Sequence, residues 1–262
     1  MYIDEYGVQY SDDKKTLVKC PTDFQGEYVI PDGVTEIADF AFLECSGLTS
    51  IVISNSVTSI GKRAFIKCTS LTSIDIPNSV TNIKSGAFDW CSALTSVNIP
   101  DSITSIKSIF ANCRGLTAVT IPNSVKSIGD GAFGNCKSLT SLIIPNSVTK
   151  IGRDAFYGCS GLTSITIPDR VKSIGNCAFE GCSSLTSVDI PNSVKSIGER
   201  AFYGCAGLTS VTLPNSIIDI GRYAFVNVNL KEVFVPAGQK SRFSGMEGLK
   251  EYADIIQEIS AE

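Results

Sequence analysis

Cysteine is the residue in this sequence whose type and spacing first suggest chemistry. Ten cysteines occur among 262 residues, and eight of them recur every 23 residues, with one step of 22. These eight are Cys45, Cys68, Cys91, Cys113, Cys136, Cys159, Cys182 and Cys205. A zinc site without histidine would need four converging thiolates, whereas a repeat presents its cysteines in a row. We therefore predict free, buried and unreactive thiols that act as small apolar side chains.

Acid–base chemistry has little support. Histidine is absent, which excludes imidazole as a base, proton shuttle or metal ligand. Asp75 and Asp189 share one position of the repeat but are five repeats apart, roughly 24 Å at about 4.8 Å per strand. That separation is too large for a catalytic carboxylate pair. No glycine-rich phosphate loop occurs either, so we expect no catalytic residue, metal or cofactor.

The apolar residues follow the same period as the cysteines. Leucine recurs in phase from Leu48 to Leu230, and Ala-Phe recurs from Ala41-Phe42 to Ala224-Phe225. Ile109-Phe110 is the one deviant pair. Internal repeats of 20–50 residues indicate a solenoid or array. One unit cannot bury its apolar face alone, so neighbouring units must share a core.

Each unit contains two apolar patterns. In the unit that starts at Leu162, apolar and polar residues alternate over 164–167, which predicts a strand with one buried face. A turn at 168–169 follows, and an extended or irregular segment crosses the opposite edge as far as Ile174. The next segment is predicted to form one or two helical turns. Its apolar residues are spaced i, i+1 and i+4 and would point inward: Ala178, Phe179 and Cys182.

The pattern Leu-x-x-Ile-x-Ile-Pro-x-x-Val-x-x-Ile-Gly-x-x-Ala-Phe-x-x-Cys resembles the BspA-like, or Treponema-type, leucine-rich repeats. The resemblance implies a leucine-rich repeat solenoid, an α/β-type right-handed coil with a parallel sheet on one face and short helical turns on the other. Members of that family are mostly bacterial surface or secreted proteins, with relatives in some protozoa. Those studied tend to bind host matrix proteins, other cells or other bacteria.

Three regions are expected. Residues 1–27 are an N-terminal β-hairpin cap, residues 28–235 contain nine repeats of 22–23 residues, and residues 236–262 are a C-terminal helical cap. Leu249, Tyr252, Ala253 and Ile256 form one amphipathic stripe of a helix over Ser244–Glu258. In the repeat at 91–113, Ile109 replaces alanine and Lys107 replaces glycine, which predicts a local change of twist.

The outward positions of the sheet are the candidate binding surface. One outward row is almost uniformly serine, and uniform positions are expected to serve the stack. The next row varies in size and charge and is free to specialise; we call it the variable row. Its members, the candidate ligand face, are Val52, Asp75, Asn98, Thr120, Ile143, Thr166, Asp189, Thr212 and Phe234. A merely solvated sheet face is the alternative interpretation.

Two other features could contribute to binding. Tyr157, Tyr203 and Trp90 lie beside the inward phenylalanines and serve either as anchors for a ligand or as half-buried packing residues. Lys126, Lys172 and Lys195 share one position of the repeat, with Lys150 adjacent to it, and are expected to be a solvated edge.

Charge and composition limit the partners. A net charge of −4 offers no electrostatic case for nucleic acid, and no apolar run is long enough for membrane insertion. We expect a monomeric, non-enzymatic module that binds a protein or glycan, and the family resemblance implies surface adhesion or host interaction. A structural spacer in a larger surface protein and an intracellular interaction scaffold are the alternatives.

The location is left open by the sequence. The resemblance implies the cell surface or secretion. The first six residues lack the basic and apolar regions of a signal peptide, so either a cytoplasmic protein or a fragment of a longer exported protein fits.

Overall fold

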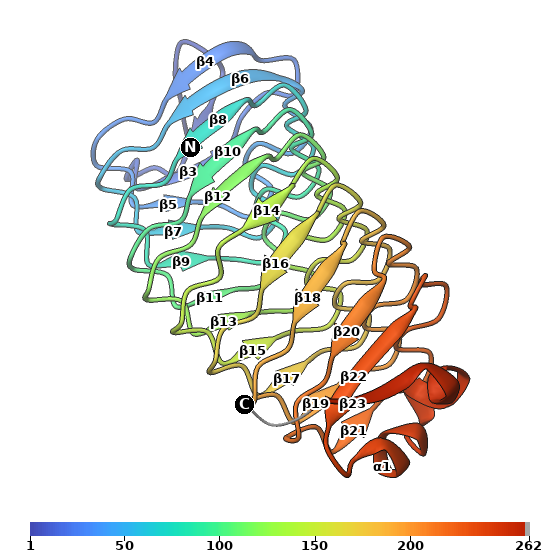
Figure 1. Cartoon of the computed structure of the whole chain (residues 1–262). Coiled ribbons are helices and arrows are strands. Elements are labelled where there is room, and N and C mark those ends of the chain that lie inside the picture. The colour runs from blue at the N-terminus through green and yellow to red at the C-terminus, as the bar shows by residue number, and fades with distance from the viewer. Residues whose placement is uncertain (260–262) are drawn as a thin grey trace.

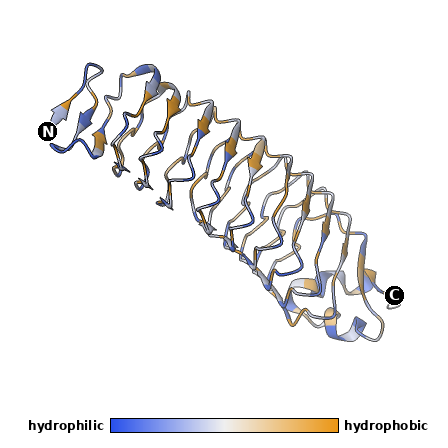
Figure 2. Ribbon diagram, turned by 90° about the vertical axis from the view of Figure 1, so that its left-hand side faces the viewer, coloured by the Kyte–Doolittle hydropathy of each residue, from blue (hydrophilic) through white to orange (hydrophobic). Residues whose placement is uncertain are grey.

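A computed structural model describes residues 1–259 and has the solenoid architecture that the repeats predict. The chain coils through about 11 turns, each called a rung here, and parallel strands follow one another on two of its sides (Figure 1). Figure 2, turned by 90°, has the rungs side by side along the molecule, with the two termini at opposite ends. The leucine-rich repeat solenoid is thus confirmed.

The first sheet contains the predicted Ile-x-Ile strands. In the middle rungs its outward serines are aligned in parallel register, as for Ser164 with Ser187, and the aliphatic residue after each serine is buried, as at Ile165 and Val188. The strands are β4 (Gln25–Val29), β6 (Gly47–Val52), β8 (Ser73–Asp75), β10 (Ser96–Asn98), β12 (Ala118–Thr120), β14 (Ser141–Leu142), β16 (Ser164–Thr166), β18 (Ser187–Asp189), β20 (Ser210–Thr212), β22 (Glu232–Pro236) and β23 (Ile256–Ile259).

A second parallel sheet replaces the extended or irregular crossing expected from the sequence. Each Ser-Ile pair, such as Ser173–Ile174, bonds to its equivalent on the next rung, and its isoleucine is buried. The strands are β3 (Thr16–Lys19), β5 (Glu36–Ile37), β7 (Ser59–Ile60), β9 (Asn82–Ile83), β11 (Ser105–Ile106), β13 (Ser127–Ile128), β15 (Lys150–Ile151), β17 (Ser173–Ile174), β19 (Ser196–Ile197) and β21 (Asp219–Ile220).

The helical turns predicted on the third side are wrong for the repeats. The Ala-Phe-x-x-Cys segments form turns, and their backbone bonds run to the next rung, as from the Phe156 N–H to the Ala178 oxygen (2.8 Å). The residues two places before and two places after each phenylalanine have positive φ, for example Asp154 (54°) and Gly158 (67°). Residues in this left-handed conformation interrupt an α-helix. The alanine, phenylalanine and cysteine of each repeat, spaced i, i+1 and i+4, therefore point inward without forming a helix.

The repeated phenylalanines form one continuous column through the core. Neighbouring rings from Phe42 to Phe225 stack with centroids 4.8–5.8 Å apart and planes within 6–13° of each other. Each ring is at most 1% exposed. The shared interior that the sequence analysis requires is therefore present, and each rung covers the ring of the next.

The repeated cysteines lie beside this column, and their thiols donate hydrogen bonds to the preceding rung. Seven thiols, from Cys68 to Cys205, donate to the carbonyl oxygen of the preceding rung's phenylalanine at 3.1–3.2 Å. Cys45 donates instead to the Pro21 oxygen, at 3.4 Å. A thiol at this position is thus more than an apolar filler, because it gives a buried carbonyl group, which already accepts a backbone N–H, a second hydrogen bond.

Native thiols should resist labelling. Nine of the ten cysteines are buried and Cys177 is partly exposed. Burial raises the pKa of Cys159 and of Cys177 to about 12, so the reactive thiolate is scarce near pH 8. We expect Ellman's reagent to label at most Cys177 within minutes in native protein and all ten cysteines in concentrated urea. Rapid labelling of most thiols before unfolding would contradict this assignment.

The irregular repeat coincides with breaks in both sheets. The second sheet ends at β9 and resumes at β11, and the first ends at β12 and resumes at β14. At the glycine position of most repeats, such as Gly152, a Cβ would come within about 3 Å of the preceding rung's backbone. Lys84 and Lys107 place real Cβ atoms at this position on successive rungs. The backbone there must shift, which accounts for the lost pairing in the second sheet.

Short antiparallel strands precede the coil. β1 (Tyr2–Ile3) pairs with β2 (Gln9–Tyr10), and β2 forms a hairpin with β3. Since β3 also pairs in parallel with β5, the coil begins inside the segment predicted as the N-terminal cap.

The C-terminal end is only partly helical. It contains α1 (Lys240–Ser244) and a 3₁₀ helix, η1 (Glu247–Ile255). Of the predicted stripe, Leu249 is buried in η1, but Ile256 begins β23, which pairs with β22. The expectation of one helix over 244–258 is corrected accordingly, and residues 260–262 of the predicted cap lie outside the described residues.

Candidate ligand-binding face

The variable row lies on the outside of the first sheet, as its phase predicts. Eight of its nine side chains are exposed, and Phe234 is half-buried. Parallel register aligns Val52, Asp75, Asn98 and Thr120 in one run. Thr166, Asp189, Thr212 and Phe234 form a second run. The row is therefore a real alignment on the surface; its role in binding stays a prediction.

Ile143 lies where the two runs meet. It follows β14, next to the break in the first sheet, and its side chain is 86% exposed. Val52 is also exposed, at 55%. Two aliphatic side chains thus face water from a row whose other exposed members are all polar.

Stacking bonds come from threonine rather than from the outward serines. The hydroxyl of Thr95 donates to the Thr72 oxygen at 3.2 Å, and that of Thr186 to the Thr163 oxygen at the same distance. Among residues 1–259, no hydrogen bond involves the hydroxyls of the serine row that begins at Ser50 and Ser73. The expectation that the uniform serine row serves the stack is therefore not met, because the threonine one place earlier does so.

Two grooves lie at the edge of the first sheet where its strands end and the Pro-Asn or Pro-Asp turns begin. They were not predicted from the sequence. Each combines variable-row residues with the Pro-Asn or Pro-Asp turn that follows. The first is lined by Asp75, Ile76, Pro77, Asn78, Asn98, Ile99, Pro100, Asp101, Thr120, Ile121, Pro122 and Asn123. The second is lined by Asp169, Asp189, Ile190, Pro191, Asn192, Ser193, Thr212, Leu213, Pro214, Asn215, Pro236, Ala237 and Ile259. The recurring Asn or Asp after proline was the available signal, but it was interpreted only as a turn.

The aromatic side chains on the turn side were interpreted either as ligand anchors or as half-buried packing residues, and the structure contains both kinds. Trp90 and Tyr157 are each 41% exposed, whereas Tyr203 is half-buried. The Arg200 guanidinium lies 4.4 Å from the Tyr203 ring centre, and that of Arg114 lies 5.4 Å from Trp90. The three rings lie on separate rungs, and two of them already have cationic neighbours, so the variable row is the more continuous surface.

Asp89, beside Trp90, should make the stability of the protein depend on pH. Burial raises the pKa of its carboxyl to about 6, although it accepts the Ala111 N–H at 3.0 Å. Because the folded-state pKa exceeds the unfolded value, the native state binds more protons between about pH 4 and 6. The free energy of unfolding therefore falls as pH rises through that range.

Asp89→Asn removes this ionisation while keeping the acceptor oxygen. We expect it to raise the free energy of unfolding by about 1–2 kcal/mol at pH 8, after allowance for the partial exposure of the group. At pH 4 it should change little, since the carboxyl is then protonated in the native state. Urea unfolding at both pH values measures this, and an equal change at the two would contradict the assignment.

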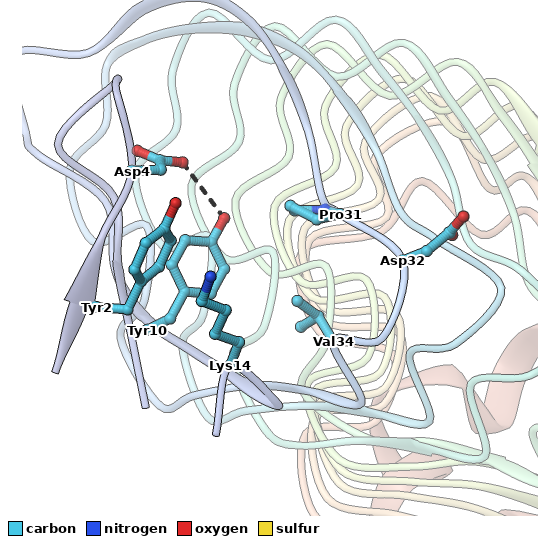
Figure 3. A pocket seen from close by; sticks show the side chains of 7 residues that line it. All are labelled: Tyr2, Asp4, Tyr10, Lys14, Pro31, Asp32 and Val34. Carbon is cyan, nitrogen blue, oxygen red and sulfur yellow. Dashed lines mark hydrogen bonds between the residues drawn. The ribbon is translucent and has the colours of Figure 1, made fainter. Parts of the chain in front are cut away.

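A small pocket at the N-terminal end belongs to the cap. Tyr2, Tyr10 and Lys14 lie on one side of it and Pro31 and Val34 on the other (Figure 3). The polar groups at this pocket hold the cap together. The Asp4 carboxylate accepts a hydrogen bond from the Tyr28 hydroxyl (2.6 Å), and the hydroxyls of Tyr10 and Tyr28 are hydrogen-bonded to each other. The Lys14 ammonium lies 3.7 Å from the Tyr2 ring centre.

Within residues 1–259, no group of three or more Cys, Asp or Glu side chains is arranged to hold a metal ion. None of the helices in the same span is long and apolar enough to cross a membrane.

The sequence profile of the BspA-type leucine-rich repeat region matches residues 22–140 and 126–246, in six copies. The chain belongs to this family. A search of curated proteins finds no match.

Among solved structures, the Treponema pallidum leucine-rich repeat protein is similar over 98% of this BspA-type chain and 97% of its own, with 23% identity and a TM-score of 0.51. That similarity shows the fold alone. A leucine-rich cell surface protein of Faecalibacterium prausnitzii covers 94% of this chain and 97% of its own (24% identity, TM-score 0.40). A leucine-rich repeat protein of Bacteroides ovatus covers all of both chains (26%, 0.41).

Proposed function

We propose that this BspA-type chain is a non-enzymatic module that binds a protein or a glycan through the outer face of its first sheet, at the bacterial cell surface. The surface location follows what membership in the BspA-type family implies. Leucine-rich repeat solenoids are typical of interaction proteins, which present a broad surface built from many repeats.

One observation carries the choice of face. Two rows whose side chains bond successive rungs, the threonine row and the cysteine row, are uniform. The adjacent variable row is exposed and differs from rung to rung. Within residues 1–259, the side chains of the variable row make no hydrogen bond and no ion pair. Variation at exposed positions without a structural bond is what a recognition surface requires.

The test is binding to a panel of purified host matrix proteins and arrayed glycans. The row variant replaces Asp75, Asn98, Thr120, Ile143 and Thr166 with serine. The control variant replaces Lys126, Lys150, Lys172 and Lys195, which are exposed on another edge of the coil, with serine. We expect the row variant to lose at least about tenfold in affinity for the ligand that the wild type binds, and the control to keep it. Retention of binding by the row variant would refute the assignment.

An intracellular interaction scaffold is the second candidate, and the cysteines favour it. All ten are unpaired within the described residues, and free thiols are typical of reducing compartments. Their burial also fits an exported protein. Protease treatment of intact cells distinguishes the two, because a surface module is cleaved and a scaffold is protected.

A further inference from the structure

The variable row contains apolar and acidic positions separated by neutral polar ones along the axis of the coil. Ile143 lies between two acidic positions, three rungs after Asp75 and two rungs before Asp189. At about 4.8 Å per rung, the two carboxylates are roughly 24 Å apart along the axis, with the exposed isoleucine between them. An extended peptide rises about 3.3 Å per residue, so about eight residues would span this distance.

The side chains that line the grooves on either side of Ile143 are acidic or uncharged, and one guanidinium, that of Arg242, bonds to the lining residue Asn215 of the second groove (3.1 Å). Asp75 and Asp101 line the first, and Asp169 and Asp189 line the second. None of these four carboxylates accepts a hydrogen bond or joins an ion pair within residues 1–259. The remaining lining side chains are amides, hydroxyls, prolines and aliphatic residues, which contribute no opposing charge.

Basic side chains lie on a different edge. Lys126, Lys172 and Lys195 precede the second sheet at one repeat position, and Lys150 lies beside them. The lysine edge is therefore separate from the grooves, whose charged lining side chains are all acidic. Charge complementarity across a face selects its partner and raises its association rate.

From this arrangement we propose that the ligand of the first sheet is an extended basic segment of a partner protein. The segment lies across the strands from β8 to β18, with lysine or arginine side chains in both grooves and an apolar side chain on Ile143. This inference rests on the proposed function, whose ligand it identifies by chemistry. Exposed ion pairs contribute little singly, so the binding depends on several contacts and weakens with salt.

The probe is a synthetic peptide of eight residues with two lysines at each end and a central leucine, labelled with fluorescein. A second peptide carries glutamate in place of each lysine. Fluorescence anisotropy compares the wild type, Asp75→Asn/Asp189→Asn and Ile143→Ser. The control Glu199→Gln/Asp219→Asn removes the same charge from exposed acids outside the grooves.

We expect the lysine peptide to bind the wild type at least about tenfold more tightly than the glutamate peptide. The groove variant should weaken it about tenfold and Ile143→Ser about threefold, while the control stays within about twofold. Absence of lysine-peptide binding, or equal weakening by the control, would overturn the proposal.

The inference and the proposed function can fail separately. If the groove variant keeps a matrix-protein or glycan ligand that the serine row variant loses, the face binds a ligand without needing its charge. The basic segment is then wrong and the binding face stands. If the row variant keeps every ligand, the proposed face itself is wrong.

Discussion

Phe133→Ala should lower the free energy of unfolding by about 3–5 kcal/mol. The ring is fully buried and stacks on Phe110 and Phe156, with centroids 5.8 and 5.7 Å away. Removing the ring leaves a cavity between neighbouring rungs. Backbone hydrogen bonds fix the spacing of these rungs, so the surrounding side chains can fill the cavity only partly. Urea unfolding followed by circular dichroism measures the change.

Tyr157→Ala is the matched control, because it removes an exposed ring from the turn side of the coil. We expect a loss below about 1 kcal/mol. A similar small loss for Phe133→Ala would mean that the phenylalanine column does not hold neighbouring rungs together.

The second large effect is expected for Gly175→Ala. A Cβ here would lie 2.6 Å from the Arg153 nitrogen and closer still to the carbonyl carbon of Gly152. Backbone cannot yield as a side chain does, so the rungs must separate locally at β15 and β17. We expect a loss of about 2–3 kcal/mol, measured by the same unfolding experiment.

Gly134→Ala supplies the comparison, because its added Cβ meets nothing closer than 3.6 Å. It should change stability by less than about 1 kcal/mol. Equal effects of the two substitutions would show that close approach of the rungs is not what requires glycine at position 175.

The repeat period made the register and the core predictable. Residues spaced by one period must take equivalent positions, so the column from Phe42 to Phe225 and the outward placement of the variable row follow from counting. The second sheet was not predictable in the same way. Its strands contribute two residues per rung, as at Ser173–Ile174, which is too few to display an alternating pattern.

The turn side was misinterpreted because two conformations present the same inward spacing. Ala178, Phe179 and Cys182 fit a helical face, yet the backbone alternates into the left-handed region at Cys177 and Gly181. The available signal was the recurrence of Gly or Asn two residues after phenylalanine, as at Asn135 and Gly158.

The grooves were missed for a related reason. Asn78 and Asp101 were assigned to turns alone, although the Asn78 side chain accepts the Asp101 N–H of the next rung (3.1 Å) and both residues lie next to Asp75 and Asn98. Only the three-dimensional course of the chain brings the turn of one rung beside the strands of its neighbours. The candidate row was thus predictable from the repeat period, but the concave surface around it was not.

Distances between spin labels on the variable row test the central claim most directly. Cysteines are introduced in pairs at Asp75 and Thr166, Asp75 and Asp189, and Asp75 and Thr212 in a Cys177→Ser background, in which the nine remaining native thiols are buried. Stacking in register predicts separations of roughly 19, 24 and 29 Å, increasing by about 4.8 Å per rung. Separations that do not increase in equal steps would contradict the in-register coil and the single face built on it.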